Sequence, residues 1–291
     1  MTHADFYMED MIRRIQFEGF KDINPRPKYA DGAPAHTISV NHTFRSYDLS
    51  KGDFPICTLR PQAWKTGIRE IFTIYQKPTN DIATMHDMGV TWWDEWDIGD
   101  GTIGQRYGAT VSRYDLINNL IKDIVNDPYG RRKIVSLWQE QDLHETPGLA
   151  PCAFLTIWNV RGEYLDMMLV QRSGDMLTAS GPGGINEIQY AALLMMIARH
   201  TGYKPGVFSH VVANEQIYDR HMEAAEEMLR RIDAKMIAET YSATTTLDWG
   251  PILPKLVLNP KAQNFYDMTI DDFTMENYEP MKPQLKLELG I

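Results

Sequence analysis

The sequence lacks the features that mark secreted, membrane-spanning and metal-binding proteins. Only two cysteines, Cys57 and Cys152, occur among 291 residues, which excludes a disulfide framework and favours a reducing compartment. No apolar run approaches the roughly 20 residues that cross a bilayer, and residues 1–14 carry early acidic side chains and no signal-peptide core. The histidines form no HExxH motif and pair with no CxxC motif. We therefore expect a cytoplasmic protein without a metal and without membrane contact.

A basic surface is also missing. The chain has 29 Lys and Arg against 39 Asp and Glu, a formal net charge of −10. General nucleic-acid binding is not expected, because it needs a basic surface that neutralises phosphates. Any phosphate site has to be a local pocket of positive charge. The chain also has no internal repeat and no Gly/Ser-rich linker, so we expect a single domain over residues 1–291.

The spacing of apolar residues predicts an α+β fold. Helical spacing predicts helices over residues 4–18, 62–76, 115–125, 187–201 and 218–231. Runs of β-branched, aromatic or large apolar residues predict strands over 133–138, 152–160, 164–172 and 207–213. The chain order, with helices first, then sequential strands and then mixed elements, is typical of the α+β class.

Cys152 follows a proline and begins an apolar strand. A buried cysteine of this kind is more often a core residue than a reactive one. A nucleophilic role requires positive charge or a base that favours the thiolate. No histidine adjoins Cys152 in the sequence, so an activating group has to come from elsewhere in the fold.

Arginines occur in two separate turns, at Arg131-Arg132 and at Arg172-Ser173. Adjacent charges are usually solvated, but guanidinium groups also match the oxygens of a phosphate. Two such turns in an acidic chain make a local anion site plausible.

A tryptophan cluster is the other unusual feature. Trp92, Trp93 and Trp96 lie close together; they serve either as packing residues or as an aromatic wall for a planar ligand. Glu70 lies within a helical apolar pattern, where a carboxylate is ordinarily exposed. The glycine-rich residues 181–184 lack the GxGxxG spacing of a dinucleotide site.

Together these segments resemble the thymidylate synthase superfamily over nearly the whole chain. The motifs that carry the resemblance are, in chain order, DGAPAHTIS (31–39), WKTGIREIF (64–72), GVTWWDEW (89–96), GTIGQRYG (101–108), GRRKIVSLW (130–138), LAPC (149–152), QRSGD (171–175), IYDRH (217–221) and NFYDMTIDDF (264–273). The resemblance implies an α+β fold with a large, bent, mixed β-sheet covered by helices. It also implies a two-fold homodimer that forms through one face of the sheet, with arginines shared across the interface.

The resemblance implies folate-dependent one-carbon transfer to C5 of a pyrimidine nucleoside 5′-monophosphate, with 5,10-methylenetetrahydrofolate as co-substrate and no metal. Cys152 resembles the nucleophile that adds to C6 of the base, which makes C5 able to attack a one-carbon unit. Glu70 resembles the carboxylate that orders water and moves protons, and Tyr107 the tyrosine near the C5 proton. Asn186 resembles the asparagine that reads the base.

The remaining expected contacts, all implied by the resemblance, are to the phosphate, the sugar and the folate. Phosphate ligands from the same subunit would be Arg26, Arg172 and Ser173, and those from the partner subunit Arg131 and Arg132. The sugar would contact Gln216 and Tyr218, and the folate Trp92, Trp93 and Asp175. Clustered arginines would both anchor the phosphate and acidify the cysteine.

Four departures from the family pattern concern the walls of the expected site. The segment between Asp175 and Tyr190 is three residues longer than usual, and Gln216 stands where the family has a histidine. Trp92 stands where a smaller residue is common, and Ala153 follows the cysteine where a histidine is frequent. Altered sugar and folate walls around an intact chemical core predict 5-hydroxymethylation, in which water captures the exocyclic methylene. The first alternative is a thymidylate synthase, which makes dTMP from dUMP by reductive methylation. An alternative of another class is a non-catalytic nucleotide- or RNA-binding relative.

The identity of the base stays open at this point. The Asn186 amide fits N3–H and O4 of uracil directly, and when flipped it fits N3 and the N4 amine of cytosine. Because Gln216 changes the expected sugar contact, a ribonucleotide also remains possible. CMP, dCMP and dUMP are therefore all candidate substrates.

Overall fold

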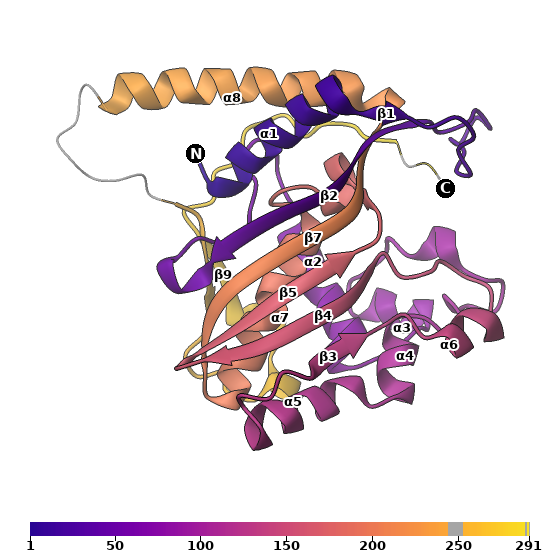
Figure 1. Cartoon of the computed structure of the whole chain (residues 1–291), viewed down its shortest axis with the longest axis vertical. Coiled ribbons are helices and arrows are strands. Elements are labelled where there is room, and N and C mark those ends of the chain that lie inside the picture. Colours follow the sequence, from indigo (N-terminus) through magenta and orange to yellow (C-terminus); the bar gives the residue numbers. More distant parts are fainter. Residues whose placement is uncertain (244–252, 289, 291) are drawn as a thin grey trace.

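The computed structural model describes residues 1–243, 253–288 and 290, and it has the α+β architecture expected from the sequence (Figure 1). Among the described residues, seven strands form one mixed sheet in the order β1-β2-β7-β5-β4-β3, with β6 paired to β7. Their bounds are β1 Phe20–Lys21, β2 Thr37–Asp48, β3 Lys133–Ser136, β4 Ala153–Arg161, β5 Tyr164–Gln171, β6 Gly174–Asp175 and β7 Lys204–Tyr218. β7 runs parallel to β5 and antiparallel to β2. A separate pair, β8 Lys255–Leu258 and β9 Phe273–Glu276, is antiparallel.

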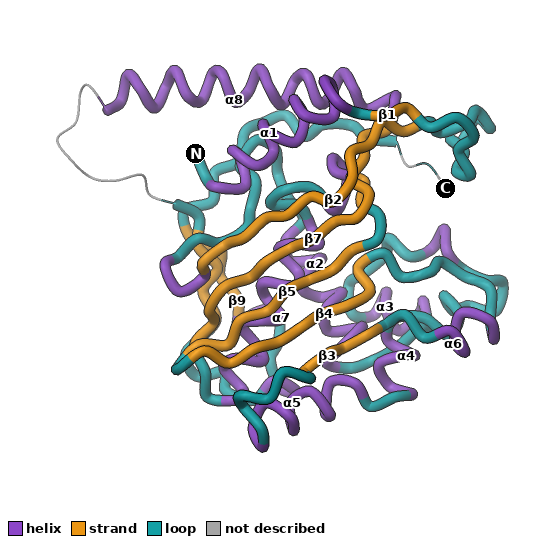
Figure 2. Tube along the Cα trace, viewed as in Figure 1, coloured by secondary structure: helices purple, strands orange, loops and turns teal. Residues whose placement is uncertain are grey.

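The helices lie on one side of the sheet and along its edge. They are α1 His3–Glu18, α2 Trp64–Ile71, α3 Ile82–Asp87, α4 Gly108–Arg113, α5 Leu116–Asn126, α6 Glu140–Glu145, α7 Ile185–Thr201 and α8 Met222–Ala243. In Figures 1 and 2, α2 and α7 lie behind the sheet, and no described segment crosses the front of β2, β7, β5 and β4. Phe44 on β2 and Ile134 on β3, which alternate with buried neighbours, are 60% and 53% exposed. The sheet therefore has one bare face that carries apolar side chains.

Helix α7 is the buried centre of the molecule. It contacts α2 and β7, and its apolar side chains, such as Leu193, Leu194 and Ile197, have no exposed surface. A helix covered on all sides is apolar all round rather than amphipathic. It ends at Gly202, which caps it in the left-handed region (φ 80°). The predicted helix over 187–201 is thus confirmed, with its start two residues earlier.

The bounds of three predicted elements differ by more than two residues from those observed. The predicted strand over 207–213 is longer, because β7 pairs with β2 as far as Tyr218 opposite Thr37. The predicted helix over 218–231 therefore begins only at Met222, and it extends to Ala243. The predicted helix over 62–76 is α-helical only to Ile71, after which residues 72–76 form a π-helical turn. No helix of the described residues is long and apolar enough to cross a membrane.

Candidate active site

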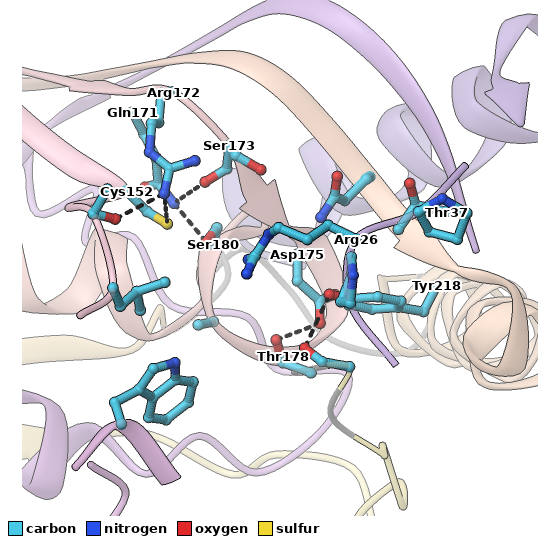
Figure 3. Close-up of a pocket in the computed structure, with 18 of the residues that line it drawn as sticks. Arg26, Thr37, Cys152, Gln171, Arg172, Ser173, Asp175, Thr178, Ser180 and Tyr218 are labelled. Carbon is cyan, nitrogen blue, oxygen red and sulfur yellow. Dashed lines mark hydrogen bonds between the residues drawn. The ribbon is translucent and has the colours of Figure 1, made fainter. Parts of the chain in front are cut away.

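Two adjoining cavities open at the end of β5 and share Cys152 and Asn186. The larger has a volume of about 1000 Å³, and Figure 3 shows side chains that line it. Of the residues predicted from the sequence, it is lined by Arg26, Cys152, Arg172, Ser173, Asp175, Asn186, Gln216 and Tyr218. The smaller has a volume of about 290 Å³ and adds Glu70, Trp92, Trp93 and Tyr107. Folding therefore brings together all the predicted site residues except Arg131 and Arg132.

The thiol of Cys152 is held beside a guanidinium group. Arg172 Nη2 lies 3.4 Å from Cys152 Sγ and donates to the Ala150 carbonyl at 2.7 Å, while Nε donates to the Pro151 carbonyl at 3.0 Å. Burial raises the pKa of the Cys152 thiol, and the positive charges of Arg172 and Arg26 oppose this shift. Burial of the thiol therefore works against the acidification expected from the arginines, and its effect on the pKa is the larger of the two.

Glu70 is a buried carboxylate that faces the smaller cavity from α2. Three N–H groups donate to it: Trp92 Nε1 at 3.0 Å, Trp93 Nε1, and Gln189 Nε2. Burial raises the pKa of Glu70, and these three hydrogen bonds oppose the shift. Trp92, expected only as a folate contact, therefore also binds the candidate catalytic carboxylate.

Tyr107 lies between the thiol and the tryptophans. Its hydroxyl accepts a hydrogen bond from the Cys152 backbone N–H at 3.3 Å, and its ring meets Trp93 edge-on at 5.0 Å. Its backbone has a positive φ (47°) directly before α4, a conformation in which a non-glycine residue is strained. A Cβ at the next residue, Gly108, would lie 2.3 Å from the Thr79 carbonyl oxygen, so only glycine fits there. Burial raises the pKa of Tyr107, which keeps the phenol protonated.

Another part of the larger cavity is built from the end of β7, the C-terminal segment and one loop. Gln216 and Tyr218 lie at the end of β7, and burial raises the pKa of Tyr218 to about 12. The Tyr218 hydroxyl donates to the Gly290 carbonyl at 3.4 Å, which brings the C-terminal segment to the cavity. Arg26 reaches the cavity from the loop between β1 and β2 (Figure 3).

Asp175 lies at the floor of this cavity, on β6. Its carboxylate accepts hydrogen bonds from the Thr178 hydroxyl at 2.6 Å and from the Leu177 N–H at 3.2 Å (Figure 3). Burial raises the pKa of Asp175, and His221, 4.0 Å away, opposes the shift. Asp175 is therefore a partly buried acid that lines the cavity.

Arg131 and Arg132 lie elsewhere. Both are exposed, in the turn before β3, and neither lines either cavity. No group of three or more His, Cys, Asp or Glu side chains suited to a metal ion occurs among the described residues.

Several polar residues of the site escape notice in the sequence. Gln171, Ser180 and Gln189 all hydrogen-bond around Asn186. The one available signal is spacing, since Gln189 follows Asn186 by three residues on α7 and so shares its face.

Comparison with known proteins identifies the family. The family model for thymidylate synthase matches residues 6–291. The chain belongs to the thymidylate synthase family. It is 46% identical over 298 aligned residues to a thymidylate synthase of Lactococcus lactis subsp. lactis (strain IL1403), with 100% of both chains covered. A thymidylate synthase of Streptococcus pneumoniae (strain 70585) gives the same identity and coverage.

A solved structure agrees with this assignment. The thermostable thymidylate synthase A from Bacillus subtilis superposes with a TM-score of 0.84 at 31% identity, covering 99% of each chain. The predicted thymidylate synthase fold is thus confirmed, and the chain is an enzyme of this family rather than a non-catalytic relative.

Proposed function

We propose that this enzyme converts dUMP to dTMP by reductive methylation with 5,10-methylenetetrahydrofolate. The observation that carries the proposal is the 46% identity, over full length, to relatives named thymidylate synthase. The 5-hydroxymethylation predicted from the four departures remains untested, and the names of these relatives favour methylation over it. One departure also has another explanation, because the Trp92 indole donates to Glu70.

Nucleotide binding is assigned to the larger cavity. Arg26, Arg172 and Ser173 would bind the 5′-phosphate, while Gln216 and Tyr218 would contact the sugar. A phosphate dianion bound by Arg172 brings the nucleotide close to Cys152, whose Sγ is 3.4 Å from the same guanidinium. The thiolate would then add to C6 of the base.

Proton movement is assigned to Glu70 and Tyr107. Burial raises the pKa of Glu70, which favours its protonated form, and a carboxyl group in this position would exchange protons with the base. The neutral Tyr107 hydroxyl lies next to the nucleophile and would assist removal of the C5 proton.

The smaller cavity suits the folate co-substrate, which supplies the methylene carbon and the hydride. Its walls include the aromatic rings of Trp92, Trp93, Trp96 and Tyr107, and flat aromatic surfaces stack well on a pterin ring. Asp175, in the adjoining cavity, would provide a polar contact to the same molecule. The residues present therefore fit this group.

We also propose that the enzyme is a homodimer formed through the bare face of the sheet. Apolar side chains such as Phe44 and Ile134 are exposed there. Arg131 and Arg132 lie outside the cavities of their own subunit, and a two-fold partner would supply them to the other phosphate site.

The reaction is tested by incubating the enzyme with methylenetetrahydrofolate and, separately, dUMP, dCMP, CMP and UMP. Mass spectrometry identifies the nucleotide product, and absorbance follows dihydrofolate. We expect dTMP from dUMP with one dihydrofolate per product. A hydroxymethyl nucleotide without dihydrofolate would contradict the proposal. Cys152→Ala serves as the control, and we expect it to bind dUMP without turnover.

A further inference from the structure

We propose that Gln189 is a positioning residue that fixes the orientation of the Asn186 amide and thereby sets the preference for uracil over cytosine. The inference rests on the proposed function, since it concerns how the same site chooses its base. Gln189 is 2% exposed, lies on α7 and lines the smaller cavity.

Hydrogen bonds link Asn186 to Glu70 through Gln189. Asn186 Nδ2 donates to Gln189 Oε1 at 3.0 Å, and Gln189 Nε2 donates to the Glu70 carboxylate. An ionised carboxylate only accepts, so Gln189 has to turn its NH₂ group toward Glu70. The Gln189 oxygen then faces Asn186, which therefore has to donate to it from its own NH₂ group. The ionised form of Glu70 therefore determines the orientation of both amides, first that of Gln189 and then that of Asn186.

On the opposite side of Asn186, the hydrogen bonds require the same orientation of its amide. Ser180 Oγ lies 2.9 Å from Asn186 Oδ1, and Gln171 Nε2 donates to Ser180 Oγ at 2.7 Å. Gln171 Nε2 also donates to the backbone carbonyl of Ser173 at 2.9 Å, which only accepts. The Gln171 amide is thereby fixed, and the Ser180 hydroxyl is left to donate to Asn186 Oδ1. Both sides of Asn186 thus require the same amide orientation.

Gln171 Nε2 has two hydrogens, which its shorter bonds to Ser173 and Ser180 use, so its approach to Asn186 Oδ1 at 3.4 Å takes up no lone pair. The oriented amide therefore has one N–H and one lone pair left for a ligand. Uracil offers a donor at N3 and an acceptor at O4, which complement this pair. Cytosine offers an acceptor at N3 and a donor at N4, which do not. To read cytosine, Asn186 would have to flip, which places its oxygen against the Gln189 oxygen. Turning Gln189 as well would place that oxygen against Glu70. Either change leaves a buried polar group without a partner.

The experiment measures dissociation constants of dUMP and dCMP by calorimetry for the full chain and for Gln189→Met. Methionine keeps the volume and the helix but cannot bond to Asn186 or Glu70. Only the Ser180 side then still favours one orientation of the Asn186 amide. A flip no longer sets the Asn186 oxygen against the Gln189 oxygen, so we expect the preference for dUMP over dCMP to fall roughly tenfold, the scale of one unsatisfied buried group. Gln189→Asn, too short to reach both partners, is the second variant, and we expect the same fall.

Tyr190→Phe is the matched control. Tyr190 follows Gln189 on α7, and its buried hydroxyl lies 3.1 Å from the Tyr75 hydroxyl, outside the contacts of Asn186. We expect the ratio of the dUMP and dCMP dissociation constants in this variant to equal that of the parent. Folded Gln189 variants that keep the parental ratio would overturn the inference and leave the proposed function intact. A parent that fails to bind dUMP would instead overturn the proposed function.

Discussion

Arg172 shows how one side chain serves two purposes at the residue scale. The carbonyls of Ala150 and Pro151 hold its guanidinium group, and the same group contacts Cys152 Sγ at 3.4 Å. The segment that carries the nucleophile thus positions its own counter-charge. Burial raises the pKa of Cys152 and Arg172 opposes that shift, so this contact favours the thiolate.

Replacing Arg172 with glutamine tests this contact. The loss of positive charge should raise the pKa of Cys152 further, so less thiolate exists at any given pH. We expect the pH dependence of iodoacetamide alkylation to move to higher pH and the rate at neutral pH to fall. Arg161→Gln, in an exposed ion pair with Asp166, is the control and should leave the profile unchanged. An unshifted profile in Arg172→Gln would show that the guanidinium does not act on the thiol.

Trp92→Phe tests the hydrogen bond that the Trp92 indole donates to Glu70. The indole N–H stabilises the carboxylate form, so its loss should raise the pKa of Glu70 above its already raised value. If activity needs the ionised form, the acidic limb of the pH–rate profile should move upward, and kcat at neutral pH should fall several-fold. Trp96→Phe lines the same cavity without a bond to Glu70. A shift of equal size in Trp96→Phe would refute this role of Trp92.

At the element scale, a short turn after β7 ties together two segments that border the site. Arg220 donates to Asp31 at 2.7 Å and to Glu288 at 2.9 Å, and its guanidinium lies 3.9 Å from the ring centre of Tyr29. Asp31 and Tyr29 belong to the loop that carries Arg26, and Glu288 belongs to the C-terminal segment. Arg220 therefore joins the phosphate-binding loop to the segment that reaches Tyr218.

Arg220→Met should separate these segments with little effect on global stability. Exposed ion pairs contribute at most about 1 kcal/mol each, so the melting temperature should fall by less than about 4 °C. We expect KM for the nucleotide to rise roughly 5- to 10-fold, because binding must then order the loop and the segment. Steady-state kinetics and a thermal melt measure both quantities. An unchanged KM would rule out the tie as a contribution to binding.

At the scale of the whole molecule, the bare sheet face and the distant arginines require one common explanation. Arg131 and Arg132 are exposed and outside both cavities, although the resemblance implies that they bind phosphate. A two-fold dimer through the sheet satisfies both observations. That residues 1–291 form a single domain also remains a prediction.

Subunit mixing tests the shared site. Cys152→Ala and the double variant Arg131→Ala/Arg132→Ala should each be nearly inactive alone. In a mixed dimer, one of the two sites combines an intact Cys152 with intact arginines. Random exchange makes half of the dimers mixed, so activity should recover to about a quarter of the parent value. If mixing under exchange restores nothing, the arginines do not cross an interface.

The sequence by itself determined the local elements and the chemistry-bearing residues. Helix α7 and its end at Gly202 follow from apolar content and a capping glycine, because these signals act between near neighbours. The motifs around Cys152, Arg172 and Tyr218 were sufficient to indicate the family. The prediction of hydroxymethylation rests on single departures from the family pattern. Full-length relatives at 46% identity are named thymidylate synthase, which favours methylation instead.

Only the tertiary structure decided how these residues act on one another. Gln189 and Glu70 are 119 positions apart, yet they share a hydrogen bond, and no periodic signal connects them. The raised pKa of Cys152 depends on burial, which arises only when distant segments close over the thiol. Tyr218 ends a strand rather than starting a helix because β2 pairs with it across the sheet. Local patterns specify elements, whereas desolvation and long-range pairing exist only after those elements have packed.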